Sequence, residues 1–117
     1  MAQFMIMMHE NDGAWDGTPI DEQKRLFKLY LDWAKELQSR DMMRGGDALA
    51  RGGRMLRVVN GDVVDGPFTE TKEVLTGYFQ IEAPDMETAA QVARGCPGLL
   101  HGETVIVRQI TDHSELK

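Results

Sequence analysis

The spacing of apolar residues changes several times along the chain, and each change predicts an element. Residues 4–8 read FMIMM and are followed by a polar turn. This run is too short for a helix and predicts a strand, in which alternate side chains face opposite sides. The two faces carry Phe4, Ile6 and Met8, and Met5, Met7 and His9. Both faces are apolar up to His9, so we expect both to be covered.

A long amphipathic helix follows. Thr18 is the expected N-cap, Pro19 suits the first helical position, and Asp21 places a carboxylate in the first turn. The helix should end near Arg40, before a Gly-Gly pair. Apolar residues recur at spacings of three and four, which predicts one buried face. That face comprises Leu26, Phe27, Tyr30, Trp33, Ala34 and Leu37.

The middle of the chain predicts a hairpin. Asn60-Gly61 lies between the β-branched runs 55–59 and 62–64, and Asn-Gly in that context is a strong hairpin signal. Residues 47–51 could form a short strand before it. After the hairpin come Asp65, Gly66 and Pro67, and then Phe68, which we expect to fill part of the core.

The last third predicts a strand, a helix and a final strand. Residues 77–83 alternate between apolar and polar, and residues 104–110 form the last strand. Asp85 is the expected cap of the second helix, and Gly95 and Pro97 should end it. Residues 111–117 are expected to be a solvated tail. The apolar stripe of the second helix is Met86, Ala89, Ala90 and Ala93.

This order predicts one α+β domain over residues 1–117, with a ferredoxin-like βαββαβ fold and an extra β-hairpin. Two helices can cover only one face of its sheet. Because the first and last strands carry apolar residues on both faces, we expect a second subunit to cover the other. The predicted assembly is a homodimer of the dimeric α/β-barrel type.

The composition and net charge of the chain indicate which classes of partner it can bind. The 117 residues are 42% hydrophobic and 27% charged, which is typical of a globular protein. With 13 basic and 19 acidic residues the net charge is −6, which argues against nucleic acid and anionic membranes as partners. The chain shows no apolar run of about 20 residues and no signal-peptide pattern. Its single cysteine fits a cytoplasmic location.

The chain carries no strong catalytic motif, so chemistry must come from dispersed residues. His9 suits acid/base work, but it could also simply hydrogen-bond nearby backbone. Asp65 is fixed by the Gly-Pro that follows it, and could act on a ligand or cap its own turn. Cys96 reads as a structural residue, and we predict neither a metal site nor a cofactor.

Further candidates would bind a ligand. Tyr78 and Gln80 lie on the strand face expected to meet the barrel interior, where polar groups need a partner. They could line a ligand pocket or hydrogen-bond across the dimer. Arg108 is placed similarly on the last strand. Glu70, Lys72 and Glu73 form a charged cluster, which could line the pocket or be a solvated surface.

Several segments together resemble the DGPF-type members of the YCII-related family. They are DGPFTETKE, GYFQIEAPDMETAAQVARGCPG, VIVRQI, the early GGDAL and the Met-rich first strand, and the resemblance covers residues 3–110. It implies a dimeric α/β barrel in a cytoplasmic bacterial protein. It also implies an acid/base pair in a cleft, whose positions match His9 and Asp65. Some relatives are linked to sigma factors of the extracytoplasmic-function type.

Two classes of function follow. The first is a protein that binds a small organic molecule in a barrel cleft, with acid/base catalysis by His9 and Asp65. The alternative is a non-catalytic regulatory or interaction module linked to sigma-factor-type transcriptional regulation, in which the charged loop would meet a partner.

Overall fold

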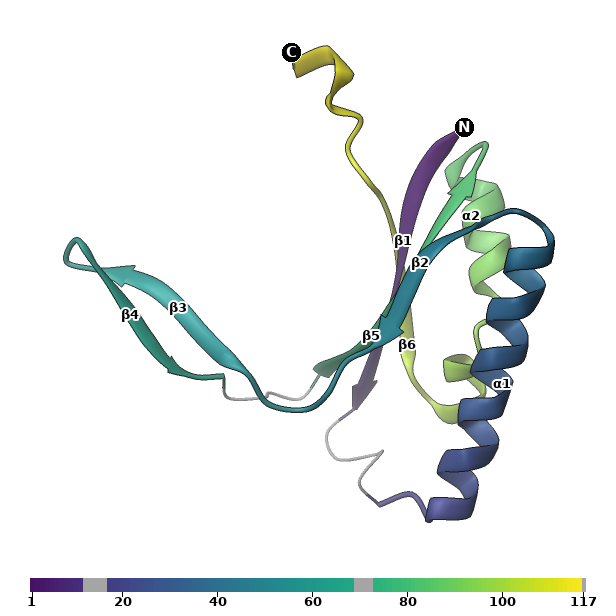
Figure 1. The fold of residues 1–117 in the computed structure, drawn as a ribbon, viewed down its shortest axis with the longest axis horizontal. Coiled ribbons are helices and arrows are strands. Elements are labelled where there is room, and N and C mark those ends of the chain that lie inside the picture. The colour runs from purple at the N-terminus through teal and green to yellow at the C-terminus, as the bar shows by residue number, and fades with distance from the viewer. Residues whose placement is uncertain (12–16, 69–72, 117) are drawn as a thin grey trace.

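The fold is a four-stranded antiparallel sheet with two helices on one face and a hairpin that stands away from it (Figure 1). The computed structural model describes residues 1–11, 17–68 and 73–116. Its elements are β1 (Ala2–Asn11), α1 (Ile20–Ser39), β2 (Met43–Ala48), β3 (Arg54–Val59), β4 (Asp62–Pro67), β5 (Glu73–Ala83), α2 (Met86–Ala93), the 3₁₀ turn η1 (Pro97–His101), β6 (Thr104–Gln109) and the 3₁₀ turn η2 (His113–Leu116). No helix of the described residues is long and apolar enough to cross a membrane.

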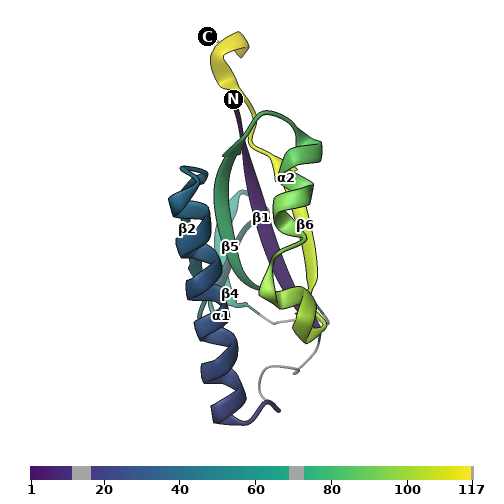
Figure 2. The same cartoon turned by 90° about the vertical axis from the view of Figure 1, so that its right-hand side faces the viewer.

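The strand order β2-β5-β1-β6 confirms the predicted ferredoxin-like α+β fold. Strand β1 is central and pairs antiparallel with β5 and β6, so it extends beyond the predicted residues at both ends. Its two faces are those predicted: Phe4, Ile6 and Met8 are buried under the helices. Figure 2 shows α1 and α2 side by side on that face of the sheet.

Helix α1 forms as predicted, with two corrections. Its cap is Pro19 and not Thr18, because the Pro19 carbonyl accepts the first helical hydrogen bond, from Gln23 N at 3.0 Å. Leu26, Trp33 and Leu37 are buried, but Phe27 is 60% exposed and does not belong to the core. The predicted apolar face is therefore wrong at Phe27.

Helix α2 has the predicted cap, since Asp85 Oδ1 accepts a hydrogen bond from Thr88 N at 2.8 Å. Its buried stripe is Ala89, Val92 and Ala93. Met86 and Ala90, which belong to the predicted apolar stripe, are exposed. The helix meets the sheet along a narrower line than the apolar pattern indicates.

Strand β2 lies four residues earlier than predicted at its start, at Met43, and ends at Ala48. It crosses close to β5 at Gly46, whose φ is +154°. A Cβ at Gly46 would lie 2.6 Å from Phe79 Cδ1 and 2.7 Å from the Tyr78 carbonyl oxygen, so only glycine fits there.

The predicted hairpin is confirmed as β3–β4, with its turn at Asn60 (φ 52°) and Gly61 (φ 85°). It projects to the side opposite the helices (Figure 1). The Cα radius of gyration is 16.5 Å, against roughly 13 Å for a compact chain of this length. Phe68, which follows β4, is 43% exposed, so the prediction that it fills the core is wrong.

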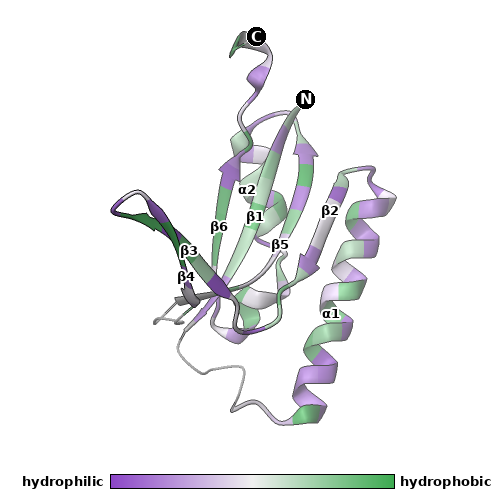
Figure 3. Ribbon diagram, turned by 60° about the vertical axis from the view of Figure 1, so that its left-hand side comes forward, coloured by the Kyte–Doolittle hydropathy of each residue, from purple (hydrophilic) through white to green (hydrophobic). Residues whose placement is uncertain are grey.

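Both faces of the hairpin carry exposed apolar residues, and Figure 3 shows the hydrophobic stretches along β3 and β4. Cross-strand neighbours Val58 and Val63 are 69% and 67% exposed on one face, and Val59 and Val64 are exposed on the other. A two-stranded ribbon of this kind is marginally stable by itself in water. It therefore presents two apolar surfaces that the chain itself does not cover.

Candidate functional site

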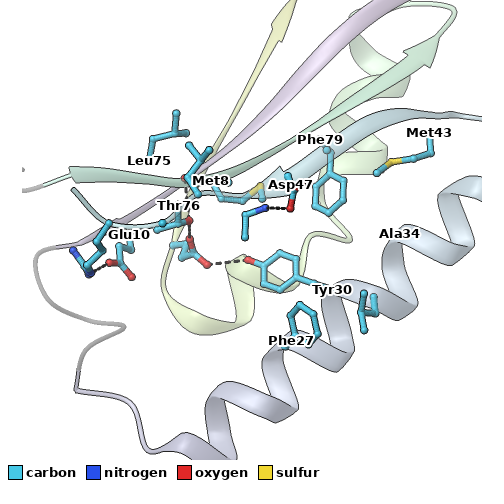
Figure 4. A pocket seen from close by; sticks show the side chains of 18 of the residues that line it. Met8, Glu10, Phe27, Tyr30, Ala34, Met43, Asp47, Leu75, Thr76 and Phe79 are labelled. Atoms are coloured by element: carbon cyan, nitrogen blue, oxygen red, sulfur yellow. Dashed lines mark hydrogen bonds and ion pairs between the residues drawn. The ribbon is translucent and has the colours of Figure 1, made fainter. Parts of the chain in front are cut away.

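A cavity of about 390 Å³ lies between α1 and the sheet, on the side of β2 and β5 (Figure 4). Its wall is mostly apolar. The larger apolar residues on the wall include Met8, Phe27, Leu31, Met43, Leu75 and Phe79. The exposure of Phe27 is thus explained by its position at the cavity rather than in the core.

One end of the cavity carries a hydrogen-bonded cluster around Glu103, the residue before β6. Tyr30 of α1 donates its hydroxyl to Glu103 Oε1 at 2.8 Å. Thr76 of β5 donates its hydroxyl to Glu103 Oε2 at 2.7 Å and also lies 3.2 Å from the Met8 carbonyl oxygen. Helix, sheet and the connection before β6 therefore meet at one carboxylate.

Burial raises the pKa of two groups close to that carboxylate, Tyr30 and Cys96. Burial, followed by the nearby Cys96 and Glu103, raises the pKa of Tyr30 well above its usual range. Burial also raises the pKa of the Cys96 thiol to about 11. Tyrosine and cysteine are already neutral at pH 7 at their ordinary pKa values, and these shifts move both groups further from ionisation, so Tyr30 remains a hydrogen-bond donor.

A second polar group on the wall is the ion pair of Glu10 and Arg51 (Figure 4). Glu10 is 3% exposed, and a buried carboxylate of this kind requires a cationic or hydrogen-bonding partner. Arg51 follows β2 and reaches Glu10 at the end of β1. The pair joins the two strands at the edge of the cavity.

The predicted pair of His9 and Asp65 does not contact within the described chain. The Asp65 carboxylate lies on the hairpin and pairs with Arg54, whose Nε donates to Oδ1 at 3.0 Å. His9 follows a shift of register in β1, and its Nδ1 is buried without a hydrogen-bond partner among the described residues.

Three of the predicted ligand-binding residues, Tyr78, Gln80 and Arg108, lie on the open face of the sheet and not in the cavity. Tyr78 is opposite Met7, and Gln80 and Arg108 flank Met5 on either side. Gln80 Nε2 donates to Gln3 Oε1. Glu70 and Lys72 lie outside the described residues, and Glu73 begins β5.

Sequence reasoning missed the cluster of Tyr30, Thr76 and Glu103. One signal was present: Tyr30 is a hydroxyl-bearing side chain in the apolar stripe of a helix, and a buried tyrosine hydroxyl usually has a partner. Glu103 gave no signal, because it follows Gly102 in a turn and only the fold brings it to Tyr30. Among the described residues no group of His, Cys, Asp and Glu could hold a metal ion.

Comparison with known proteins places the chain in a family. One similar solved structure is 5-chloro-2-hydroxyhydroquinone dehydrochlorinase (TftG) from Burkholderia phenoliruptrix AC1100, in complex with 2,5-dihydroxybenzoquinone, with a TM-score of 0.50, 16% identity and coverage of 97% of each chain. At that identity the likeness concerns the fold. No curated protein matches the sequence significantly. The model of the YCII-related domain matches residues 2–113. The chain therefore belongs to the YCII-related domain family.

Proposed function

We propose that this protein binds a small organic molecule in the cavity between α1 and the sheet. The observation that carries the proposal is the cavity itself, with about 390 Å³ of space and a mostly apolar wall. Small-molecule sites are typically concave and apolar with a few fixed polar groups. The Tyr30–Glu103–Thr76 cluster and the Glu10–Arg51 pair supply such groups.

Two observations support an aromatic or ring-shaped ligand: the aromatic residues on the cavity wall, and a solved structure with a similar fold. Phe27, Tyr30 and Phe79 contribute aromatic surface, which favours a flat ring-sized ligand. TftG is a dehydrochlorinase in complex with a single-ring quinone. We infer a flat ligand of one or two rings for this chain, which the cavity of about 390 Å³ can hold.

Acid/base catalysis by His9 and Asp65 is the finer part of the proposal, and it requires a second subunit. Within one chain Asp65 is held by Arg54 on the hairpin, so only another copy can bring an equivalent carboxylate to His9. The buried Nδ1 of His9, without a partner among the described residues, supports this role. A structure of the dimer tests it: an oxygen of Asp65 of the partner subunit should lie within about 3.2 Å of a His9 ring nitrogen. A longer distance in every interface would remove the pair from the proposal.

We further propose that the protein is a homodimer. The open sheet face carries Met5, Met7 and Ile106, and the hairpin projects from the same side with apolar residues on both faces. These surfaces occur together on one chain, so two copies can cover each other by an isologous contact. If the hairpin stays exposed in the assembly, it could instead bind another protein, which would support the alternative of an interaction module.

A thermal-shift experiment with 2-naphthol tests the cavity. Ala34 lies on the cavity wall in α1, so Ala34→Phe should fill the space and remove the stabilisation that the probe gives the wild type. Ala90→Phe is the matched control, since Ala90 is exposed on α2 and should leave the shift intact. An equal shift in both variants would place the ligand elsewhere.

A further inference from the structure

The carboxylate of Glu103 lies on the cavity wall, and no described residue places a cation beside it. Its two oxygens accept hydrogen bonds from the neutral hydroxyls of Tyr30 and Thr76. In the part of the chain that the structure describes, no Lys, Arg or His side chain forms an ion pair with Glu103. A half-buried carboxylate next to apolar surface is stabilised by any further donor that comes within reach.

The position of this carboxylate is fixed from three sides. Tyr30 holds it from α1 and Thr76 from β5. Gly98 closes the third side: a Cβ there would lie 2.6 Å from Tyr30 Oη and 2.9 Å from Glu103 Oε1. Each carboxylate oxygen has two acceptor positions and uses one for these hydroxyls, so both retain capacity for a ligand donor.

The other charged groups of the wall do not offset Glu103. Glu10 and Arg51 form an ion pair with each other, and Asp47, another carboxylate, is the remaining charged residue among the described residues of the wall. These described residues therefore include two more acidic than basic groups, counting Glu10, Asp47 and Glu103 against Arg51. An anionic ligand would face like charges in a partly desolvated space.

We propose that Glu103 is the polar anchor of the ligand, and that the cavity selects ring-sized compounds that carry a hydroxyl or amino donor while it rejects carboxylates. This inference rests on the proposed function of the cavity. The donor of the ligand binds the free acceptor positions of Glu103, and its ring packs against the apolar wall between α1 and the sheet. Glu103 thereby sets both the orientation and the charge preference of the site.

Three probes with one ring system test the preference: 2-naphthol, 2-naphthylmethylamine and 2-naphthoate. Titration calorimetry on the wild type should give at least about tenfold tighter binding for the two donors than for the carboxylate, because a hydrogen bond to a charged group is worth about that much. Glu103→Gln should weaken the amine by about tenfold or more and leave 2-naphthoate unchanged or tighter. Glu36→Gln, an exposed substitution on α1, should change none of the three affinities.

The outcomes separate this inference from the proposed function. If 2-naphthoate binds the wild type as tightly as the donors, and Ala34→Phe abolishes all binding, the cavity is the site and the role of Glu103 is wrong. If none of the probes binds, both proposals fall. If Glu103→Gln does not fold, the affinities of the wild type for the three probes decide whether the cavity prefers donors over carboxylates.

Discussion

Arg54 and Asp65 hold each other across the β3–β4 hairpin through two hydrogen bonds between guanidinium and carboxylate. Arg54 begins β3, and Asp65 lies on β4 opposite Leu56, so the pair closes the base of the projecting ribbon. The aspartate that opens the Asp-Gly-Pro-Phe motif thus has a structural partner on its own hairpin. Any additional role for its carboxylate must be compatible with that partner.

The exposure of this pair predicts a small energetic coupling. The Arg54 and Asp65 side chains are 74% and 37% exposed, and such ion pairs contribute about 1 kcal/mol or less. A double-mutant cycle of Arg54→Ala and Asp65→Ala, measured by urea denaturation, should return a coupling in that range. A coupling above about 2 kcal/mol would mean that another surface buries the pair.

The apolar hairpin predicts a dimer that one charge can dissociate. Light scattering should give the wild type twice the 13.2 kDa mass of the chain. Val58→Asp places a carboxylate in the exposed Val58–Val63 pair and should shift the protein toward the monomer without unfolding it. Leu100→Asp is the control, because Leu100 is even more exposed than Val58 but lies in η1, outside the hairpin. A monomeric wild type would contradict the homodimer.

The buried thiol of Cys96 predicts a loss of stability in alkali. Its folded pKa is about 11 against an ordinary value of 9.0, so the unfolded chain loses the proton first as pH rises. The free energy of unfolding should be unaffected by this group below pH 9 and should fall by roughly 2 kcal/mol between pH 9 and 11. Tyr30, whose pKa is also raised, adds to the loss at still higher pH. Cys96→Ala should show a shallower decline over that interval in urea melts, and an identical decline would exclude Cys96 as the cause.

Two aromatic residues of α1 should differ sharply in their contribution to stability. Trp33 is buried and packs edge-on against Phe79 with ring centroids 4.9 Å apart. Trp33→Ala should therefore destabilise the fold by about 3–5 kcal/mol. Phe27 is exposed at the cavity, and Phe27→Ala should cost less than about 1 kcal/mol in urea denaturation. Equal losses would mean that Phe27 is covered by something outside the chain.

The fold was largely readable from the sequence, because its signals are local. The short apolar run of residues 4–8 predicted strand β1, Asn60-Gly61 predicted the hairpin turn, and Asp85 predicted the start of α2. The wrong predictions concern residues whose burial depends on how elements pack in space and not on the local apolar pattern. Phe27 and Phe68 are apolar in sequence, yet the cavity and the projecting hairpin leave them exposed.

The candidate site was not readable in the same way. Tyr30, Thr76 and Glu103 come from three separate segments, and only the sheet register and the packing of α1 bring them together. His9 and Asp65 were predicted from residue type and local turn chemistry, which do not determine the distance between the two side chains. Their proposed contact depends on a second subunit, and one sequence carries no direct signal for the arrangement of two copies.

A crystal structure of the protein with 2-naphthol tests the proposed ligand site most directly. We expect the ring to lie between α1 and the β2–β5 side of the sheet, in the cavity lined by Phe27 and Phe79. The naphthol oxygen should lie within about 3.2 Å of the Glu103 carboxylate. A probe bound on the open sheet face or the hairpin, with the cavity empty, would contradict it.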